Sequence, residues 1–189
     1  MPLSPPAKRR HLHTRRVECF GYLREDGLFD IEGHIVDTKT YDCTDMEDVT
    51  PAGQPIHDMW LRLTLDKDFV IRDVDAAMDA RPYTTCPQVL PDMRSLIGLR
   101  IGPGFKRHVK ERIGGIKGCT HLVELLGPVA TVAFQTMASD IVSDDGEKMR
   151  AEPAQPYFLN GCHSWRTDGP QVEKRFPQFF TGSPSRRSA

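Results

Sequence analysis

Apolar and polar residues alternate along four segments in the first half of the chain. Asp26-Gly27 lies between the first two segments, and Asp-Gly is a strong signal for a tight hairpin. The two-residue period is typical of half-buried strands, and it covers residues 15–22, 28–37, 57–66 and 69–76. The pattern therefore predicts a meander of four consecutive antiparallel strands.

The second and third of these segments separate into an apolar and a polar face. The apolar positions include Ile31, Ile35 and Leu61, while His34 and Arg62 fall among the polar ones. Because alternate residues of a strand point to opposite faces, we expect His34 and Arg62 to face each other on the side away from the core.

The hydrophobic period changes in the second half of the chain. Spacings typical of helices cover residues 90–99, 104–112 and 119–139, and Gly127-Pro128 should bend or divide the last of them. Strands followed by helices indicate an α+β fold, with an antiparallel meander covered by helices on one face.

Charge and composition disfavour two classes of partner, nucleic acids and membranes. The 189 residues carry a formal net charge of −1, which argues against a nucleic-acid partner. No apolar run is long enough to span a membrane, and no apolar segment follows the basic start, so we expect a cytoplasmic protein without a membrane partner. We predict one domain over residues 9–181, a flexible arm over 1–8 and a disordered tail over 182–189.

Five cysteines are spread widely, which disfavours a disulfide framework. Cys119 follows Gly118 at the expected start of a helix, where the helix dipole favours a thiolate that binds metals or attacks electrophiles. Cys119 and His121 can converge on one ion only if Cys119 lies on the loop side of the helix start. The alternative is a small cysteine that fills helix packing.

Further candidates lie around the sheet. Cys86 is in the rigid loop after the strands, and Asp58 could ligate a metal or orient a ligating histidine. His57, or His34 with Asp37, could supply acid and base chemistry. Each of these also has an ordinary structural interpretation, as a loop thiol or as polar groups at the start of a strand.

Three residues are candidates for binding a substrate. Arg62 could attract an anionic small molecule, and Cys162-His163 forms a second thiol and imidazole pair. Soft thiolates and imidazoles together suit zinc or iron. A Gly-rich turn before the basic helix over 104–112 could hold an anion, although capping a solvated helix is the simpler interpretation.

Several motifs resemble one bacterial family of unknown function, DUF2889. They cover most of the chain, roughly from Arg9 to Phe180, and are DIEGHIVDTK at 30–39, PIHDM at 55–59, GCTHL at 118–122 and FLNGCH at 158–163. The resemblance implies no settled activity.

A fainter similarity concerns the order of site residues in iron–sulfur scaffold proteins of the IscU/NifU type. On that resemblance, Asp58, Cys86, Cys119 and His121 would converge on one metal site. Ile56-His57-Asp58 replaces the first cysteine and glycine of those proteins. A mononuclear zinc or iron site is therefore expected before an iron–sulfur cluster.

Four functions stay open at this point. The first is a metal-dependent enzyme, a hydrolase or lyase, that acts on an anionic small molecule. The others are a metal or iron–sulfur carrier, a binding module for an anionic ligand, and a thiol enzyme with Cys119 as nucleophile. A homodimer is also compatible with the sequence.

Overall fold

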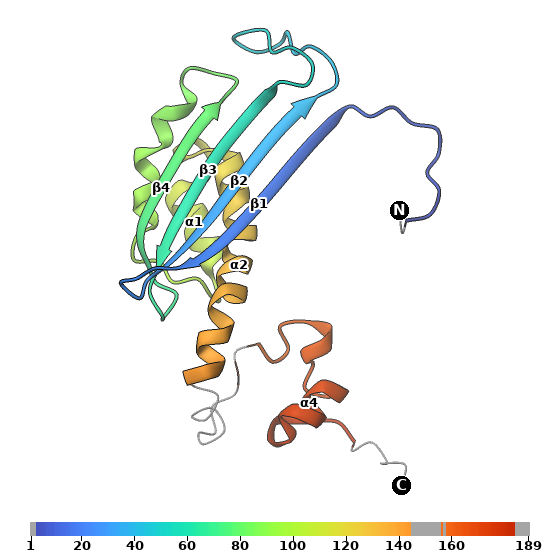
Figure 1. Cartoon of the computed structure of the whole chain (residues 1–189), viewed down its shortest axis with the longest axis vertical. Helices are drawn as coiled ribbons and strands as arrows, with labels where there is room; N and C mark the ends of the chain where they lie inside the picture. The colour runs from blue at the N-terminus through green and yellow to red at the C-terminus, as the bar shows by residue number, and fades with distance from the viewer. Residues whose placement is uncertain (1–2, 145–155, 157, 184–189) are drawn as a thin grey trace. The chain divides into compact units, whose positions relative to one another are not determined.

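The computed structural model describes residues 3–144, 156 and 158–183. Its first half is a four-stranded antiparallel sheet in the order β1-β2-β3-β4 (Figure 1). The strands are β1 (His13–Leu23), β2 (Phe29–Lys39), β3 (Pro55–Leu65) and β4 (Ile71–Ala80). The predicted meander is confirmed, and each strand extends one to four residues beyond the alternating pattern at one end or both.

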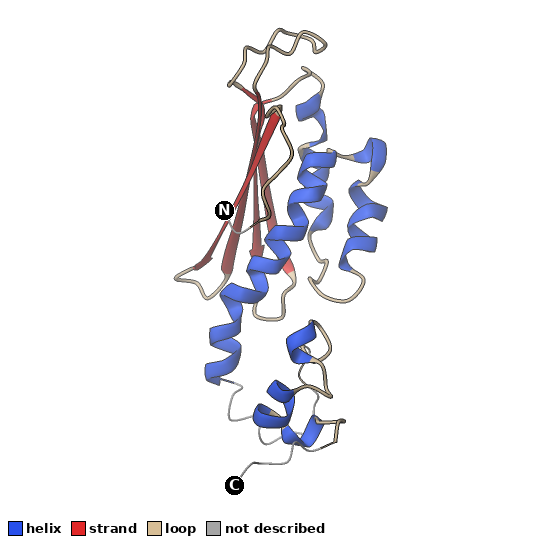
Figure 2. Cartoon of the chain, turned by 90° about the vertical axis from the view of Figure 1, so that its right-hand side faces the viewer, coloured by secondary structure: helices blue, strands red, loops and turns tan. Residues whose placement is uncertain are grey.

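One face of the sheet carries the core. The alternating apolar positions of β2 and β3, such as Ile31, Ile35 and Leu63, are fully buried. The helices that follow the sheet in this part of the chain lie on that face (Figure 2). The α+β class and the one-sided covering of the sheet are confirmed.

Two helices and three short 3-10 segments complete this part. They are η1 (Cys86–Val89), η2 (Pro91–Leu96), α1 (Phe105–Ile113), η3 (Gly115–Lys117) and α2 (Thr120–Asp144). The helix expected over residues 90–99 is wrong in kind and length. Each of the two short 3-10 turns carries a proline at its start, Pro87 as the second residue of η1 and Pro91 as the first of η2, and the left-handed backbone at Gly98 ends the run.

The helix is not divided at Gly127-Pro128, because α2 continues through Pro128, so of the two expected outcomes the division is wrong. Pro128 is exposed, whereas its neighbours Leu126 and Val129 are buried against the core. The proline ring therefore faces solvent and does not disturb the packed face of the helix.

Helix α2 approaches the sheet most closely over glycines of β1 and β2. A Cβ atom at Gly33 would lie 2.6 Å from Val129 Cγ2 and 3.0 Å from Leu125 Cγ. A Cβ at Gly21 would meet Thr136. Missing side chains at these two positions let the helix lie directly on the strands.

The chain divides into two compact units, Met1–Ala138 and Ser139–Ala189. The second unit contains η4 (His163–Trp165), α4 (Pro170–Arg175) and η5 (Pro177–Phe179). Three aromatic rings, Phe158, Trp165 and Phe176, contact one another within it. The single domain over residues 9–181 stays a prediction, and most of the predicted tail over 182–189 lies outside the described residues.

In the described part of the chain, no helix combines the length and apolar character that a membrane span requires.

Candidate metal centre

Side chains from β1, β2 and β3 meet around Asp37, near one end of the sheet face that the helices cover, here called the inner face. Asp37 lies opposite Arg15 of β1 and opposite His57 of β3. Directly opposed residues share a face of the sheet, so these side chains meet beneath the helical layer. The Asp37 side chain is only 1% exposed.

The Asp37 carboxylate accepts four hydrogen bonds. Arg15 donates two of them, from Nε to Oδ1 at 2.8 Å and from Nη2 to Oδ2 at 2.7 Å. His13 Nε2 donates to Oδ1 at 2.9 Å and His57 Nδ1 to Oδ2 at 3.0 Å. An ionised carboxylate only accepts, so these two ring nitrogens carry the protons.

The start of α2 completes the cluster. His121 Nε2 lies 4.0 Å from Asp37 Oδ2, and Glu124 one turn later accepts a hydrogen bond from Arg15 Nη1 at 2.6 Å. Cys119 immediately precedes the helix, and its Sγ lies 3.8 Å from His121 Nδ1. Cys119 thus occupies the loop-side position that convergence with His121 requires.

The two inner imidazoles, His57 and His121, are in contact. Their ring centroids are 3.7 Å apart and the planes are tilted by 36°. Burial lowers the pKa of His57, and repulsion between the two rings when both are protonated lowers it further, while Asp37 opposes the shift. Burial and the nearby Arg15 charge lower the pKa of His121. Both rings are therefore neutral at pH 7, the state in which imidazole binds metals.

The charges of the carboxylate and guanidinium are fixed as well. Burial alone would raise the pKa of Asp37, but hydrogen bonds and charge from Arg15, with hydrogen bonds from His13 and His57, lower it to about 2. The hydrogen bond to Asp37 raises the pKa of Arg15. The site therefore presents an anionic oxygen and two neutral nitrogens.

Asp37, His57 and His121 together have the geometry of a metal site. Each offers one ligand atom, and the three atoms lie within 4.8 Å of one another. Ligands about 2.1 Å from a tetrahedral ion are roughly 3.4 Å apart. The 3.0 Å and 4.0 Å separations from Asp37 Oδ2 to the two imidazoles bracket that spacing. The donor set fits a mononuclear ion, which would replace the proton between His57 Nδ1 and Asp37.

An iron–sulfur cluster fits this donor set poorly. Such clusters are held mainly by cysteine thiolates. Here Cys119 is the one thiol beside the imidazoles among the described contacts.

Asp58 and His34 lie on the opposite face of the sheet from Asp37 and His57. His34 Nε2 is 2.6 Å from Asp58 Oδ1, and the His34 ring stacks on Trp60 with centroids 3.6 Å apart. The predicted ligand set of Asp58, Cys86, Cys119 and His121 is thus divided by the sheet, because Asp58 is one residue out of phase with His57.

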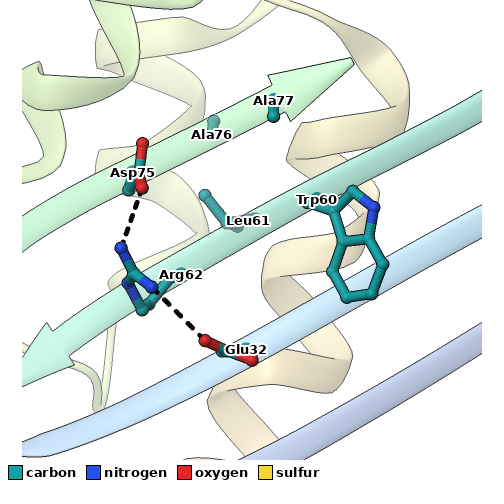
Figure 3. A pocket seen from close by; sticks show the side chains of 7 residues that line it. All are labelled: Glu32, Trp60, Leu61, Arg62, Asp75, Ala76 and Ala77. Carbon is teal, nitrogen blue, oxygen red and sulfur yellow. Dashed lines mark hydrogen bonds and ion pairs between the residues drawn. The ribbon is translucent and has the colours of Figure 1, made fainter. Parts of the chain in front are cut away.

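Arg62 also lies on this outer face, beside a shallow depression (Figure 3). It is opposite Glu32 rather than His34, since the residue facing His34 is Trp60. Arg62 Nη2 is 2.8 Å from Asp75 Oδ2 and Nη1 is 3.5 Å from Glu32 Oε1. The expected pairing of His34 with Arg62 is therefore wrong, and two carboxylates already neutralise the guanidinium proposed to bind an anion.

The remaining candidates are not part of the Asp37 cluster. Cys86 begins η1 and is half-buried, and none of its contacts joins it to the three ligands. Cys162 and His163 belong to the second unit, where His163 Nε2 lies 2.9 Å from Arg166 Nη1.

Sequence reasoning missed three contributors, His13, Arg15 and Glu124. Asp26-Gly27 marked the turn between β1 and β2 but not its length. The loop is the three residues Glu25-Asp26-Gly27, closed by Arg24 donating to the Leu28 carbonyl, and this length sets Arg15 opposite Asp37. The same turn brings His13 near the carboxylate. Glu124 follows His121 by three residues, a spacing that places both near the same side of a helix.

Comparison with known proteins gives a family but no activity. The model of a family described as "Protein of unknown function (DUF2889)" matches residues 13–135. The match covers more than half of the chain, so the chain belongs to this family. No curated protein and no solved structure matches the chain, and the similarity to IscU/NifU-type scaffolds gains no support.

Proposed function

We propose that this member of the DUF2889 family binds one divalent transition-metal ion, zinc or iron, through Asp37, His57 and His121. The observation that carries the proposal is the convergence of one carboxylate oxygen and two imidazole nitrogens within 4.8 Å of one another. Two imidazoles with one carboxylate form the donor set of many zinc hydrolases and of non-haem iron enzymes.

The proposal extends to catalysis on an anionic small molecule in the cytoplasm. Three protein ligands would leave a coordination position for water or substrate, as in metal-dependent hydrolases and lyases. With a divalent ion bound, Arg15 and the metal would contribute three positive charges against the two carboxylates of Asp37 and Glu124. The resulting positive balance favours an anionic substrate.

Metal binding tests the first part directly. Protein stripped with EDTA is titrated with Zn²⁺ and, under anaerobic conditions, with Fe²⁺, using calorimetry and elemental analysis. We expect one equivalent of metal, with at least tenfold weaker binding in His57→Gln and His121→Gln. His34→Gln, on the opposite face, is the control and should bind like the wild type. Affinity for metal unchanged in both inner variants would refute the site.

Cobalt substitution tests whether Cys119 joins the three ligands. The Cys119 Sγ lies 3.8 Å from His121 Nδ1 and 4.0 Å from Met59 Sδ. Thiolate ligation gives Co²⁺ a charge-transfer absorption that Cys119→Ser would abolish.

Activity is tested by hydrolysis of anionic aryl esters, with EDTA-stripped protein and His57→Gln as controls.

A second candidate function rests on the line from Cys119 through His121 to Asp37. Cys119 Sγ lies 3.8 Å from His121 Nδ1, and His121 Nε2 lies 4.0 Å from Asp37 Oδ2. The three residues thus follow the order of nucleophile, base and orienting carboxylate in thiol and serine hydrolases. In metal-free protein, His121 would accept the Cys119 proton as the sulfur attacks an electrophilic carbon. Iodoacetamide tests this step, because a carbon–sulfur bond forms as iodide leaves. We expect Cys119 to react faster than Cys86, and His121→Gln to remove that advantage.

A further inference from the structure

Strand β1 is an edge of the sheet with an exposed apolar surface. It is 11 residues long and pairs with β2 on one side, while no strand among the described residues pairs with its other side. Four of its large apolar side chains are more than 40% exposed: Val17, Phe20, Tyr22 and Leu23. Long apolar edge strands readily pair with another chain.

The free backbone groups of β1 follow from its pairing with β2. Thr40 donates to the carbonyl of Leu12, and Arg24 donates to that of Leu28. Hydrogen-bonded pairs alternate along an antiparallel ladder, so the even-numbered residues of β1 turn their N–H and C=O groups toward β2. The odd-numbered residues from 13 to 23 turn theirs outward, and Val17 and Cys19 lie at the middle of this row.

Three of the usual protections of an edge, a bulge, a proline and a lysine, are missing along β1. Its pairing with β2 runs from His13 to Leu23 without a bulge, and the strand contains neither proline nor lysine. The opposite edge differs, because the segment around Leu99 covers the start of β4. Ile71 donates to Leu99 and accepts from Gly98, and Val70 forms a bridge with Arg100.

We propose that two copies of this chain associate through β1, antiparallel and about a two-fold axis that passes at Val17. In an antiparallel pair, directly opposed residues share a face of the sheet, and only odd-numbered residues offer hydrogen bonds. The self-pairing must therefore centre on one residue of the strand. Centring on Arg16 or on Glu18 would oppose two identical charges, whereas centring on Val17 places Arg16 of each copy opposite Glu18 of the other.

Charge and packing both favour this register. Arg16 and Glu18 are exposed, and neither forms an ion pair with another described residue. They would meet at non-hydrogen-bonded positions, where opposed side chains are closest. Val17 would pack against Val17 of the second copy, and Phe20 against Thr14. The outcome is a continuous eight-stranded sheet with an isologous interface.

Charge reversal tests the register. Light scattering coupled to gel filtration should give the wild type twice the mass of one chain. Arg16→Glu and Glu18→Arg would each oppose like charges and should yield monomers. The double variant R16E/E18R restores complementarity and should again be dimeric. Circular dichroism checks that each variant keeps the fold, and Asp75→Arg on the distant β4 is a matched control that should stay dimeric.

A cysteine at the axis gives an independent readout. In a Cys19→Ala background, Val17→Cys should form an intermolecular disulfide under mild oxidation, since residues opposed in a sheet lie within disulfide range. Tyr22→Cys, equally exposed but away from the axis, should not. A wild type that is monomeric at high concentration, a dimer that survives both single reversals, or a dimer without the Val17→Cys crosslink would each overturn the proposal. None of these readouts depends on the metal.

Discussion

The ionisation of Asp37 is the central electrostatic feature of the chain. A carboxylate that is 1% exposed keeps its charge because Arg15 binds it through two parallel hydrogen bonds. Arg15 in turn reaches Glu124 on α2, so one cation joins β1, β2 and the helix. This pairing has a structural role whether or not an ion binds, because loss of Arg15 would leave the buried Asp37 carboxylate without its main counter-charge.

Asp37→Asn should destabilise the metal-free protein by about 2 kcal/mol, because the buried amide cannot replace the charge-assisted hydrogen bonds that the carboxylate accepts from Arg15. Urea unfolding of EDTA-treated protein measures the change. Asp58→Asn is the control: its partner is His34 on the outer face, and its side chain is 24% exposed. We expect that variant to lose less than about 1 kcal/mol. Equal losses in the two variants would contradict the argument.

The lowered pKa values of His57 and His121 predict a dependence of stability on pH. An unfolded histidine titrates near pH 6.5, so below this pH the unfolded state binds more protons than the folded state. Stability of metal-free protein should therefore fall as the pH drops from about 7.5 to 5.5. Asp37, with its pKa of about 2, loses its contribution only below about pH 4.

Differential scanning calorimetry at several pH values measures this effect. The double variant H57Q/H121Q should have a flatter slope of melting temperature against pH between 7.5 and 5.5. An unchanged slope would show that other groups titrate in this range.

At the scale of elements, the contact between α2 and β2 positions the site. Leu125 and Val129 rest on Gly33, and this close approach holds the first turn of α2, with His121 and Glu124, above Asp37. Buried residues spaced along the helix, among them Leu122 and Leu126, fix its rotation. A change at Gly33 should therefore affect both stability and the geometry of the cluster.

Gly33→Ala is expected to destabilise the protein by about 1–3 kcal/mol, because its Cβ would overlap Val129 Cγ2. Chemical denaturation measures the loss. Gly102→Ala is the matched control, since a Cβ there meets nothing within 4 Å. Adding Val129→Ala removes the clashing methyl group and should recover part of the loss. If Gly33→Ala proves neutral, the helix does not lie as close to β2 as described.

The strands were predictable from sequence because each carries a two-residue hydrophobic period, and Asp26-Gly27 marks the turn between the first two. The register of β2 with β3 was not predictable, since residues 40–54 between them form a long loop with an isolated bridge at Cys43 and Thr50. That register decides that His57, and not Asp58, meets Asp37. His121 was identified from its position beside Cys119, whereas its carboxylate partner could be found only once the strands were aligned.

At the scale of the whole molecule, the site belongs to one of two compact units. The first unit, Met1–Ala138, contains the sheet, the Asp37 cluster and the segment matched by the family model. The second contains Cys162 and His163 with the aromatic contacts of Trp165. This division separates the residues that the proposed metal centre needs from the predicted thiol and imidazole pair at 162–163.

A fragment of residues 1–144, which keeps all of α2, should therefore fold and bind metal without the rest of the chain. Its core comes from β1–β4, α1 and α2, and a chain of this length buries enough apolar surface to be stable. We expect cooperative thermal unfolding and one equivalent of Zn²⁺ with the affinity of the full chain. Cys162→Ala and His163→Ala in the full chain, which keep its length, should likewise leave Zn²⁺ affinity unchanged. Loss of binding in the folded fragment, together with loss in either point variant, would place a ligand in the second unit and contradict the three-residue site.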